Sequence, residues 1–302
     1  MTQTTYSYSR LSSFCNCKMG YYLNYVLREE NYQNIYSAIG TIVHDCLEGL
    51  QQGLYTREEI LEKFDDGLLL AELSGLEFPA DRNGGDTIRD NYVNSIIHAL
   101  NHFEKYDEAF EIEKKIEPVI NGVKMVGYID LILYHKQTEE EIELGLPQEV
   151  TILDFKTSTK FATKDLLKHG RQLIVYAIAM EQLGYKVRAV GWNMLKYAVV
   201  QGAPLKKGGY RVKVEQRNKI EPGATFEEYV QYYDYDEFTV IECEEWIKDT
   251  ANAIEALDEF DYWQPRTITK NDNFFCSKLC GVSHCCSAYK QFCRDYYNEK
   301  NQ

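Results

Sequence analysis

The chain has 302 residues and carries 33 Lys and Arg against 47 Asp and Glu, which gives a formal net charge of −14. Hydrophobic residues make up 44% of the sequence and charged residues 26%, the balance of a globular protein with a sizeable core. No apolar run is long enough for a transmembrane helix, and the N-terminus lacks the apolar segment of a secretory signal. We therefore expect an acidic cytoplasmic protein without a membrane partner, which binds phosphate groups only through a local basic patch or a bound cation.

Apolar residues at helical spacing dominate the first third of the sequence. Residues 9–27 predict a helix with Ser9 as its N-cap. Residues 40–72 predict one or two helices with a break around residues 53–56, and residues 87–106 predict another helix.

After this helix, the spacing of apolar residues changes to the alternation that is typical of strands. Residues 110–120 and 123–134 alternate between apolar and polar, and Asn121-Gly122 between them is a strong hairpin signal. Further along, the pattern predicts strands over 150–156, 187–199 and 209–216 and helices over 163–183 and 243–259. Helices followed by a mixed sheet with a crossover helix predict an α/β or α+β domain with helical additions.

Two acidic residues interrupt strands that are otherwise apolar. Asp130 lies within YIDLILY, and Asp154 lies near the end of TILDFK. A buried carboxylate costs free energy unless it is paired or binds a cation. Lys156 follows Asp154 by two residues, so both side chains point to the same face of the strand. Oxygen ligands for Mg²⁺ beside a lysine suit phosphodiester hydrolysis, although an isolated D-x-K can also be a structural ion pair.

The sequence holds nine cysteines, five of them within 18 residues near the C-terminus. Thiols clustered in a reducing compartment more often bind metal than form disulfides. The isolated Cys46 and Cys243 are better explained as buried core thiols. The others are Cys15, Cys17, Cys276, Cys280, Cys285, Cys286 and Cys293.

Five motifs occur in an order that resembles the RecB-like branch of the PD-(D/E)XK nucleases, which includes the AddB nuclease domain and the CRISPR-associated iron–sulfur exonuclease. They are an opening helix of serines, cysteine and spaced tyrosines, then G-x-x-x-H, G-x-[IV]-D, D-[FY]-K-T and Q-x-x-x-Y. In this sequence they occupy residues 7–25, 40–44, 127–130, 152–157 and 172–176.

The resemblance implies a restriction-endonuclease-like α/β fold, in which helices flank a mixed central sheet, in a single domain over residues 1–302. It implies a helical insertion at about 45–106 and a nuclease core at about 107–220. A C-terminal helix and a cysteine-rich, cluster-binding tail would occupy about 243–302.

The resemblance also implies a site for Mg²⁺ or Mn²⁺. Asp130 and Asp154 would be carboxylate ligands, helped by the carbonyl of Phe155. His44 would be a further ligand through a neutral imidazole, which suits Mn²⁺ somewhat better than Mg²⁺.

Three more residues receive catalytic roles from the resemblance. Lys156 would orient or deprotonate the attacking water and offset charge on the phosphate. Gln172 and Tyr176 are four residues apart and share one helix face, from which they could contact the substrate backbone or the lysine.

In the iron–sulfur members of this branch, one cysteine before the core joins three after it. The later trio is usually C-x2-C-x5-C, whereas the nearest match here has three residues in its first gap. The resemblance therefore implies a [4Fe–4S] cluster, with Zn²⁺ as the alternative, and with Cys15, Cys285 and Cys293 as competing ligands. The implied set is Cys17, Cys276, Cys280 and Cys286.

Two basic segments are candidates for DNA contact on this acidic chain. A solvated charged face is the alternative for both, and it explains the second segment equally well. In the first segment, basic residues recur every three or four positions after the D-x-K motif. The second segment surrounds a Gly-Gly turn. They comprise Lys160, Lys164, Lys168 and Arg171, then Lys206, Lys207, Arg211, Lys213, Arg217 and Lys219.

These observations predict a divalent-metal-dependent DNA exonuclease that acts on single-stranded or end-containing DNA in recombination, replication or repair, in a bacterium or a bacterial virus. The sequence has no G-x-x-x-x-G-K-[ST], so unwinding would require a partner helicase. A single-strand-binding or recombination protein is another expected partner. The alternatives are a catalytically silent DNA-binding or assembly module with the same fold, and a structure-specific endonuclease.

Overall fold

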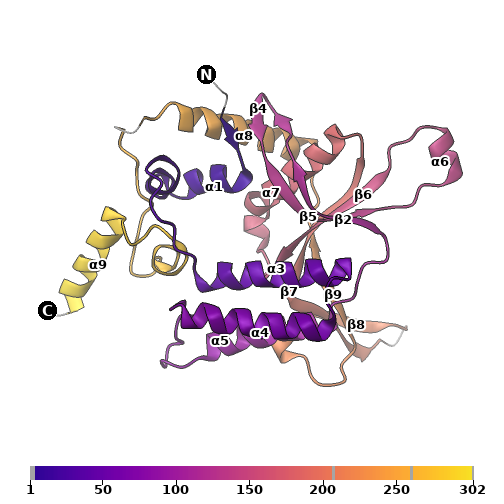
Figure 1. The fold of residues 1–302 in the computed structure, drawn as a ribbon, viewed down its shortest axis with the longest axis horizontal. Helices are drawn as coiled ribbons and strands as arrows, with labels where there is room; N and C mark the ends of the chain where they lie inside the picture. Colours follow the sequence, from indigo (N-terminus) through magenta and orange to yellow (C-terminus); the bar gives the residue numbers. More distant parts are fainter. Residues whose placement is uncertain (1–3, 206–207, 259–260, 301–302) are drawn as a thin grey trace.

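A six-stranded mixed sheet forms the centre of the computed structural model, which describes residues 4–205, 208–258 and 261–300 (Figure 1). The strand order is β2-β5-β6-β7-β8, and β9 pairs with β7. Only β6 and β7 are parallel, and helix α7 (Leu166–Gln182) crosses over between them. The strands are β2 (Ala109–Ile116), β5 (Gly127–Tyr134), β6 (Glu149–Lys156), β7 (Lys186–Pro204), β8 (Tyr210–Gln216) and β9 (Phe226–Tyr232).

Strand β7 is long enough to pair with two strands in succession along one edge. Asn193 pairs with β6 and β9, and Ala198 pairs with β8 and β9, so β6 and β8 share the edge opposite β9. The ladder to β6 ends at Lys156, and the ladder to β8 begins only opposite Tyr197. This leaves a short unpaired stretch of β7 between the two ladders.

Helices cover both faces of the sheet (Figure 1). Helices α3, α4 and α5 bury their apolar residues against one face, and α1, α7 and α8 bury theirs against the other. None of the helices within the described residues is long and apolar enough to cross a bilayer. The bounds are α1 (Tyr8–Asn16), α2 (Lys18–Tyr21), α3 (Ile35–Gln52), α4 (Arg57–Leu73), α5 (Thr87–His102), α6 (Glu139–Glu143), α8 (Glu237–Glu255) and α9 (Ser287–Lys300).

Local sequence signals explain where the helices begin and end. The predicted break between α3 and α4 is confirmed: Gly53 ends α3 with a left-handed φ of 75°, and Thr56 caps α4 in a capping box with Glu59. The first N-cap was predicted two residues too late, because Ser7 and not Ser9 accepts the hydrogen bond from the backbone of α1. The predicted first helix is also divided into α1, α2 and a π-helical turn over Tyr22–Val26.

The predicted hairpin at Asn121-Gly122 is present but belongs to a smaller sheet. Both turn residues have positive φ angles, 48° and 84°, as an Asn-Gly hairpin turn requires. The turn joins β3 (Val119–Ile120) to β4 (Val123–Met125), and β4 also pairs with β1 (Thr5–Tyr6). Farther from the turn, the central strands β2 and β5 pair with each other in the same register as β3 and β4.

Arg217 corrects the expectation that the second basic segment is an exposed face. Its side chain is only 2% exposed, and its guanidinium donates to the carbonyl of Tyr197 over 3.0 Å. It also lies 5.7 Å from the ring of Phe226 and interacts electrostatically with the half-buried Glu228. Both of these residues lie on β9, which the sequence analysis did not predict, so Arg217 stabilises the sheet and is not available to bind DNA.

Candidate active site

Asp130 and Asp154 lie on neighbouring central strands and are almost completely buried, with exposed fractions of 7% and 1%. Asp130 precedes Leu131 and Asp154 follows Leu153, and these two leucines are paired in the antiparallel register of β5 and β6, so the same register places the carboxylates opposite one another. The backbone N–H of Phe155 donates to Asp130 Oδ2 over 2.8 Å. Burial, and then the charge of Asp154, raise the pKa of Asp130 well above its usual value.

Lys156 compensates part of this negative charge. Its ammonium forms an ion pair with Asp154 Oδ2. Burial alone would lower the pKa of Lys156, but the charges of Asp154 and Asp130 outweigh burial and raise it. The lysine is therefore a cation at neutral pH, able to donate hydrogen bonds to a water or a phosphate.

His44 reaches the same place from helix α3 on the other side of the strands. Its Nε2 lies 2.9 Å from the carbonyl oxygen of Phe155, and its Nδ1 lies 3.5 Å from Asp130 Oδ2. Burial lowers the pKa of His44, which favours the neutral ring. Because a carbonyl can only accept, Nε2 carries the proton, and the lone pair of Nδ1 then faces a carboxylate oxygen. Two facing acceptors indicate a place for a cation.

Glu113 is a third acidic residue at this place, and the sequence analysis missed it. The register of β2 and β5 puts it opposite Asp130, and its φ of 48° is unusual for a residue other than glycine. Ligand atoms of His44, Glu113 and Asp130 lie within 4.8 Å of one another. A strained backbone at such a point is typical of a functional site.

Helix α7 adds Tyr176 and Gln172 to the surroundings of the carboxylates. Gln172 Nε2 donates to the hydroxyl of Tyr176 over 2.8 Å, and burial raises the pKa of this tyrosine so that it stays neutral. A Cβ atom at Gly127 would meet the Tyr176 ring at 3.4 Å, an ordinary van der Waals contact, so the ring lies directly against the glycine of the G-x-[IV]-D motif. Gln172 and Tyr176 thus pack beside the carboxylates from α7.

These donors fit a divalent cation. Carboxylate oxygens are the ligands that Mg²⁺ and Mn²⁺ prefer, and a neutral imidazole adds a nitrogen ligand. The proton on Nε2 of His44 is held by a backbone carbonyl, as is usual for a metal-binding histidine. The carbonyl of Phe155, an expected ligand, accepts this hydrogen bond and keeps a second lone pair.

Four cysteines from the two ends of the chain line one small cavity of about 20 Å³, and all nine cysteines are free of disulfides. Two backbone N–H groups, from Gly20 and Arg266, donate to Cys17 Sγ over 3.3 Å each. Cys15 instead lies 3.7 Å from the hydroxyl of Thr250 on α8. The cysteines that line the cavity are Cys17, Cys276, Cys280 and Cys286.

The predicted basic residues are not all available to DNA. Lys160 and Lys164 are exposed, and so is Lys168, which donates to Asn16. Arg171 packs its guanidinium 4.8 Å from the ring of Trp246 and pairs with Glu242 at 3.4 Å.

In the second basic segment, Arg211 is exposed and Lys213 pairs with Glu215 at 2.7 Å. The predicted contacts Lys206 and Lys207 lie outside the described residues.

A match to a protein family agrees with this geometry. The chain belongs to the PD-(D/E)XK nuclease superfamily, whose family model matches residues 5–287. It is a nuclease with the mixed, helix-flanked sheet of that superfamily. It is also similar to the crystal structure of a presumed exonuclease from Eubacterium rectale, with 12% identity, a TM-score of 0.41, and 89% of this chain and 92% of that chain covered. No curated protein matches the chain.

The geometry predicts that Glu113 contributes to metal binding. Glu113→Gln removes one carboxylate charge from the group and should weaken the binding of Mn²⁺ by about tenfold or more. Calorimetric titration of the purified protein measures this. The matched control is Glu108→Gln, an exposed position nearby, which should bind Mn²⁺ as the parent does. Equal affinities for Glu113→Gln and the parent would exclude Glu113 from the site.

Proposed function

We propose that this nuclease is a divalent-metal-dependent DNA exonuclease of the iron–sulfur RecB-like branch, acting on single-stranded or end-containing DNA. The observation that carries the proposal is the arrangement of His44 Nδ1, Asp130 and Glu113 around one point, beside the ion pair of Asp154 and Lys156. Recombination, replication or repair in the cytoplasm of a bacterium or an infected bacterial host is the setting we infer, with a helicase partner for any unwinding.

The chain's own residues have distinct tasks in this proposal. His44, Asp130, Glu113 and Asp154 would hold the cation, which supplies Lewis-acid polarisation of the phosphate and activation of a water when bound. Lys156, kept protonated by the carboxylates, donates hydrogen bonds that orient the water and stabilise charge on the phosphate.

The remaining groups keep that lysine in position. Asp154, which is 1% exposed, holds the ammonium from inside the sheet. Tyr8 of α1 also lies close enough to interact electrostatically with Lys156, and its hydroxyl donates to the carbonyl of Lys168 over 2.8 Å. The lysine is therefore enclosed between β6, α1 and α7, which restricts its geometry before substrate binds.

The catalytic assignment predicts loss of cleavage without loss of DNA binding. Asp154→Asn and Lys156→Met should each lower the rate of hydrolysis of end-labelled single-stranded DNA in Mg²⁺ or Mn²⁺ by about a thousandfold. Asp107→Asn and Lys124→Met make the same charge changes at exposed positions and should cleave at the parent rate. Parent rates in Asp154→Asn and Lys156→Met would contradict the assignment.

The same assay separates the exonuclease from its alternatives. An exonuclease degrades linear DNA and leaves covalently closed circular DNA intact. Cleavage of closed circles by the parent protein would establish an endonuclease instead. DNA binding with no cleavage in either metal would establish the silent binding module.

We also propose that the four-cysteine cavity binds a [4Fe–4S] cluster. Within the described residues, the one group of three or more potential ligands that lie within 4.8 Å of one another is His44, Glu113 and Asp130, so no three cysteine sulfurs all lie within 4.8 Å of one another. Tetrahedral Zn²⁺ would hold sulfurs about 3.8 Å apart, as its bond length of about 2.3 Å requires. A cluster places iron and sulfide between them, which suits the wider spacing.

Electrostatics and hydrogen bonding support the same proposal. Burial, and then the proximity of Cys280, raise the pKa of Cys276 to about 11, so the protein's own groups disfavour the thiolate of Cys276. A cationic cluster core would remove that penalty, and the N–H donors to Cys17 Sγ would stabilise its thiolate. The cluster would join α2 to the C-terminal tail.

Substitution of two nearby cysteines tests directly which cysteines bind the cluster. Protein purified without oxygen should contain about four irons per chain, and Cys17→Ser should lower the iron content strongly. Cys15→Ser, two residues away, should keep it. Iron analysis with an absorbance spectrum measures both variants. One zinc and no iron in the parent, or iron lost in Cys15→Ser and retained in Cys17→Ser, would contradict this set.

A further inference from the structure

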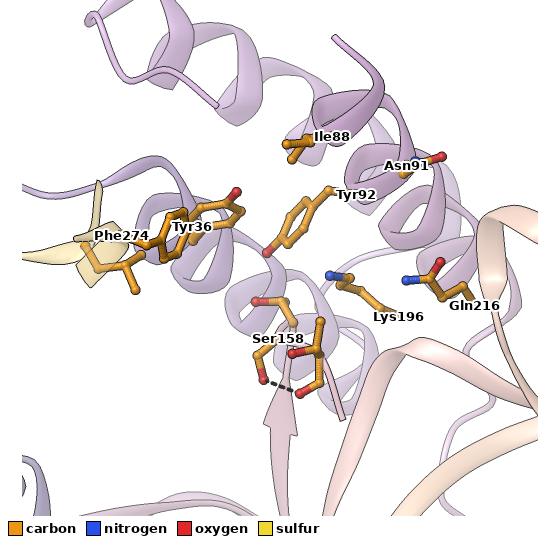
Figure 2. A pocket seen from close by; sticks show the side chains of 11 residues that line it. Tyr36, Ile88, Asn91, Tyr92, Ser158, Lys196, Gln216 and Phe274 are labelled. Atoms are coloured by element: carbon orange, nitrogen blue, oxygen red, sulfur yellow. Dashed lines mark hydrogen bonds between the residues drawn. The ribbon is translucent and has the colours of Figure 1, made fainter. Parts of the chain in front are cut away.

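A cavity of about 540 Å³ opens beside the active site where β6 ends (Figure 2). The segment Thr157, Ser158 and Thr159 lines it, and Thr157 follows Lys156 directly, at the Cα spacing of about 3.8 Å between neighbouring residues. Lys196 lines it from the part of β7 that pairs with neither β6 nor β8. The gap between the two ladders thus gives the cavity its space next to the catalytic lysine.

Aromatic side chains from three distant segments line the opposite side of this pocket. They are Tyr36 of α3, Tyr92 of α5 and Phe274 of the C-terminal tail (Figure 2). The rings of Tyr36 and Tyr92 meet edge to face at 5.4 Å, while Phe274 is 47% exposed. Exposed aromatic surface in a pocket suits the stacking of a nucleobase, which tolerates any base identity.

Lys196 gives the pocket a positive charge that the protein itself does not neutralise. Its ammonium lies 4.7 Å from the centre of the Tyr92 ring. Burial lowers its pKa, and across the described part of the chain no charged neighbour contributes to offset this effect. On a chain with a net charge of −14, an uncompensated and partly buried lysine indicates an anionic ligand.

We propose that this pocket binds one unpaired nucleotide of the DNA strand next to the scissile bond. The base packs on Tyr36 and Phe274, and the phosphate contacts Lys196. The hydroxyl of Ser158 donates to the carbonyl of Thr159 and can still accept a hydrogen bond from the sugar. The inference rests on the proposed nuclease function and goes further, because it names these residues as the determinants of strand preference.

Duplex DNA fits this pocket poorly. A base inside a duplex is stacked on both faces and paired at its edge, so it must leave the stack before it can enter. A volume of about 540 Å³ is that of a small-molecule site and suits a single nucleotide. The pocket therefore favours single strands and frayed ends over intact duplex.

The test compares binding of a labelled polythymidine strand and of a blunt duplex, without divalent ions so that no cleavage occurs. Phe274→Ala should weaken binding of the single strand about tenfold. Lys196→Met should weaken it too and reduce the slope of log affinity against log salt by about 0.7, the loss of one phosphate contact. Lys196→Arg should retain the slope. Lys124→Met, an exposed charge-matched control, should behave as the parent does.

Duplex binding should be unchanged in all these variants. Parent-like single-strand affinity in both Phe274→Ala and Lys196→Met, or equal losses for strand and duplex, would overturn the pocket assignment. The partly exposed Phe274 keeps the test decisive if Lys196→Met does not fold. The binding results stand apart from the nuclease proposal, which fails if the parent protein cleaves no DNA in Mg²⁺ or Mn²⁺.

Discussion

Two carboxylates with the same charge are buried side by side in the middle of the central sheet, and the surrounding structure is arranged to tolerate them. Asp130 and Asp154 lie on adjacent strands with exposed fractions of 7% and 1%. Such burial costs free energy unless cations compensate it. Lys156 supplies one positive charge within the chain. The acceptor pair of His44 Nδ1 and Asp130, joined by Glu113, provides the place for another.

Helices on both faces of the sheet contribute groups to this site. Helix α3 brings His44 to one side of β6, and α7 brings Tyr176 to the surroundings of the same carboxylates. The strand β6 carries Asp154 and Lys156 and ends immediately afterwards, so the candidate site lies at the end of this strand. The same early end of β6 creates the aromatic pocket beyond it, and one feature of the topology thus accounts for both sites.

Much of the candidate site could be predicted from the sequence because its residues lie in short ordered motifs. The apolar runs around Asp130 and Asp154 already placed both carboxylates in buried strands, and the period-2 geometry placed Lys156 beside Asp154. Glu113 could also have been found. Asn121-Gly122 fixes the hairpin register, and counting back from the turn pairs residue 113 with residue 130.

Other features had no local signal. Strand β9 (Phe226–Tyr232) carries acidic residues next to apolar ones, and it forms because it pairs with the far edge of β7. Arg217 was placed among exposed basic residues because composition alone does not show burial. Tyr36, Tyr92 and Lys196 are far apart in the sequence, and only the packing of α3, α5 and β7 brings them together in one pocket.

The most direct test of the central claim is an anomalous-difference map from crystals of the protein soaked in Mn²⁺. The account predicts a peak at bonding distance from His44 Nδ1, Asp130 and Glu113, while Nε2 of His44 keeps its hydrogen bond to the carbonyl of Phe155. Ordered crystals with no peak between these three side chains, or with Mn²⁺ bound only elsewhere, would contradict the account.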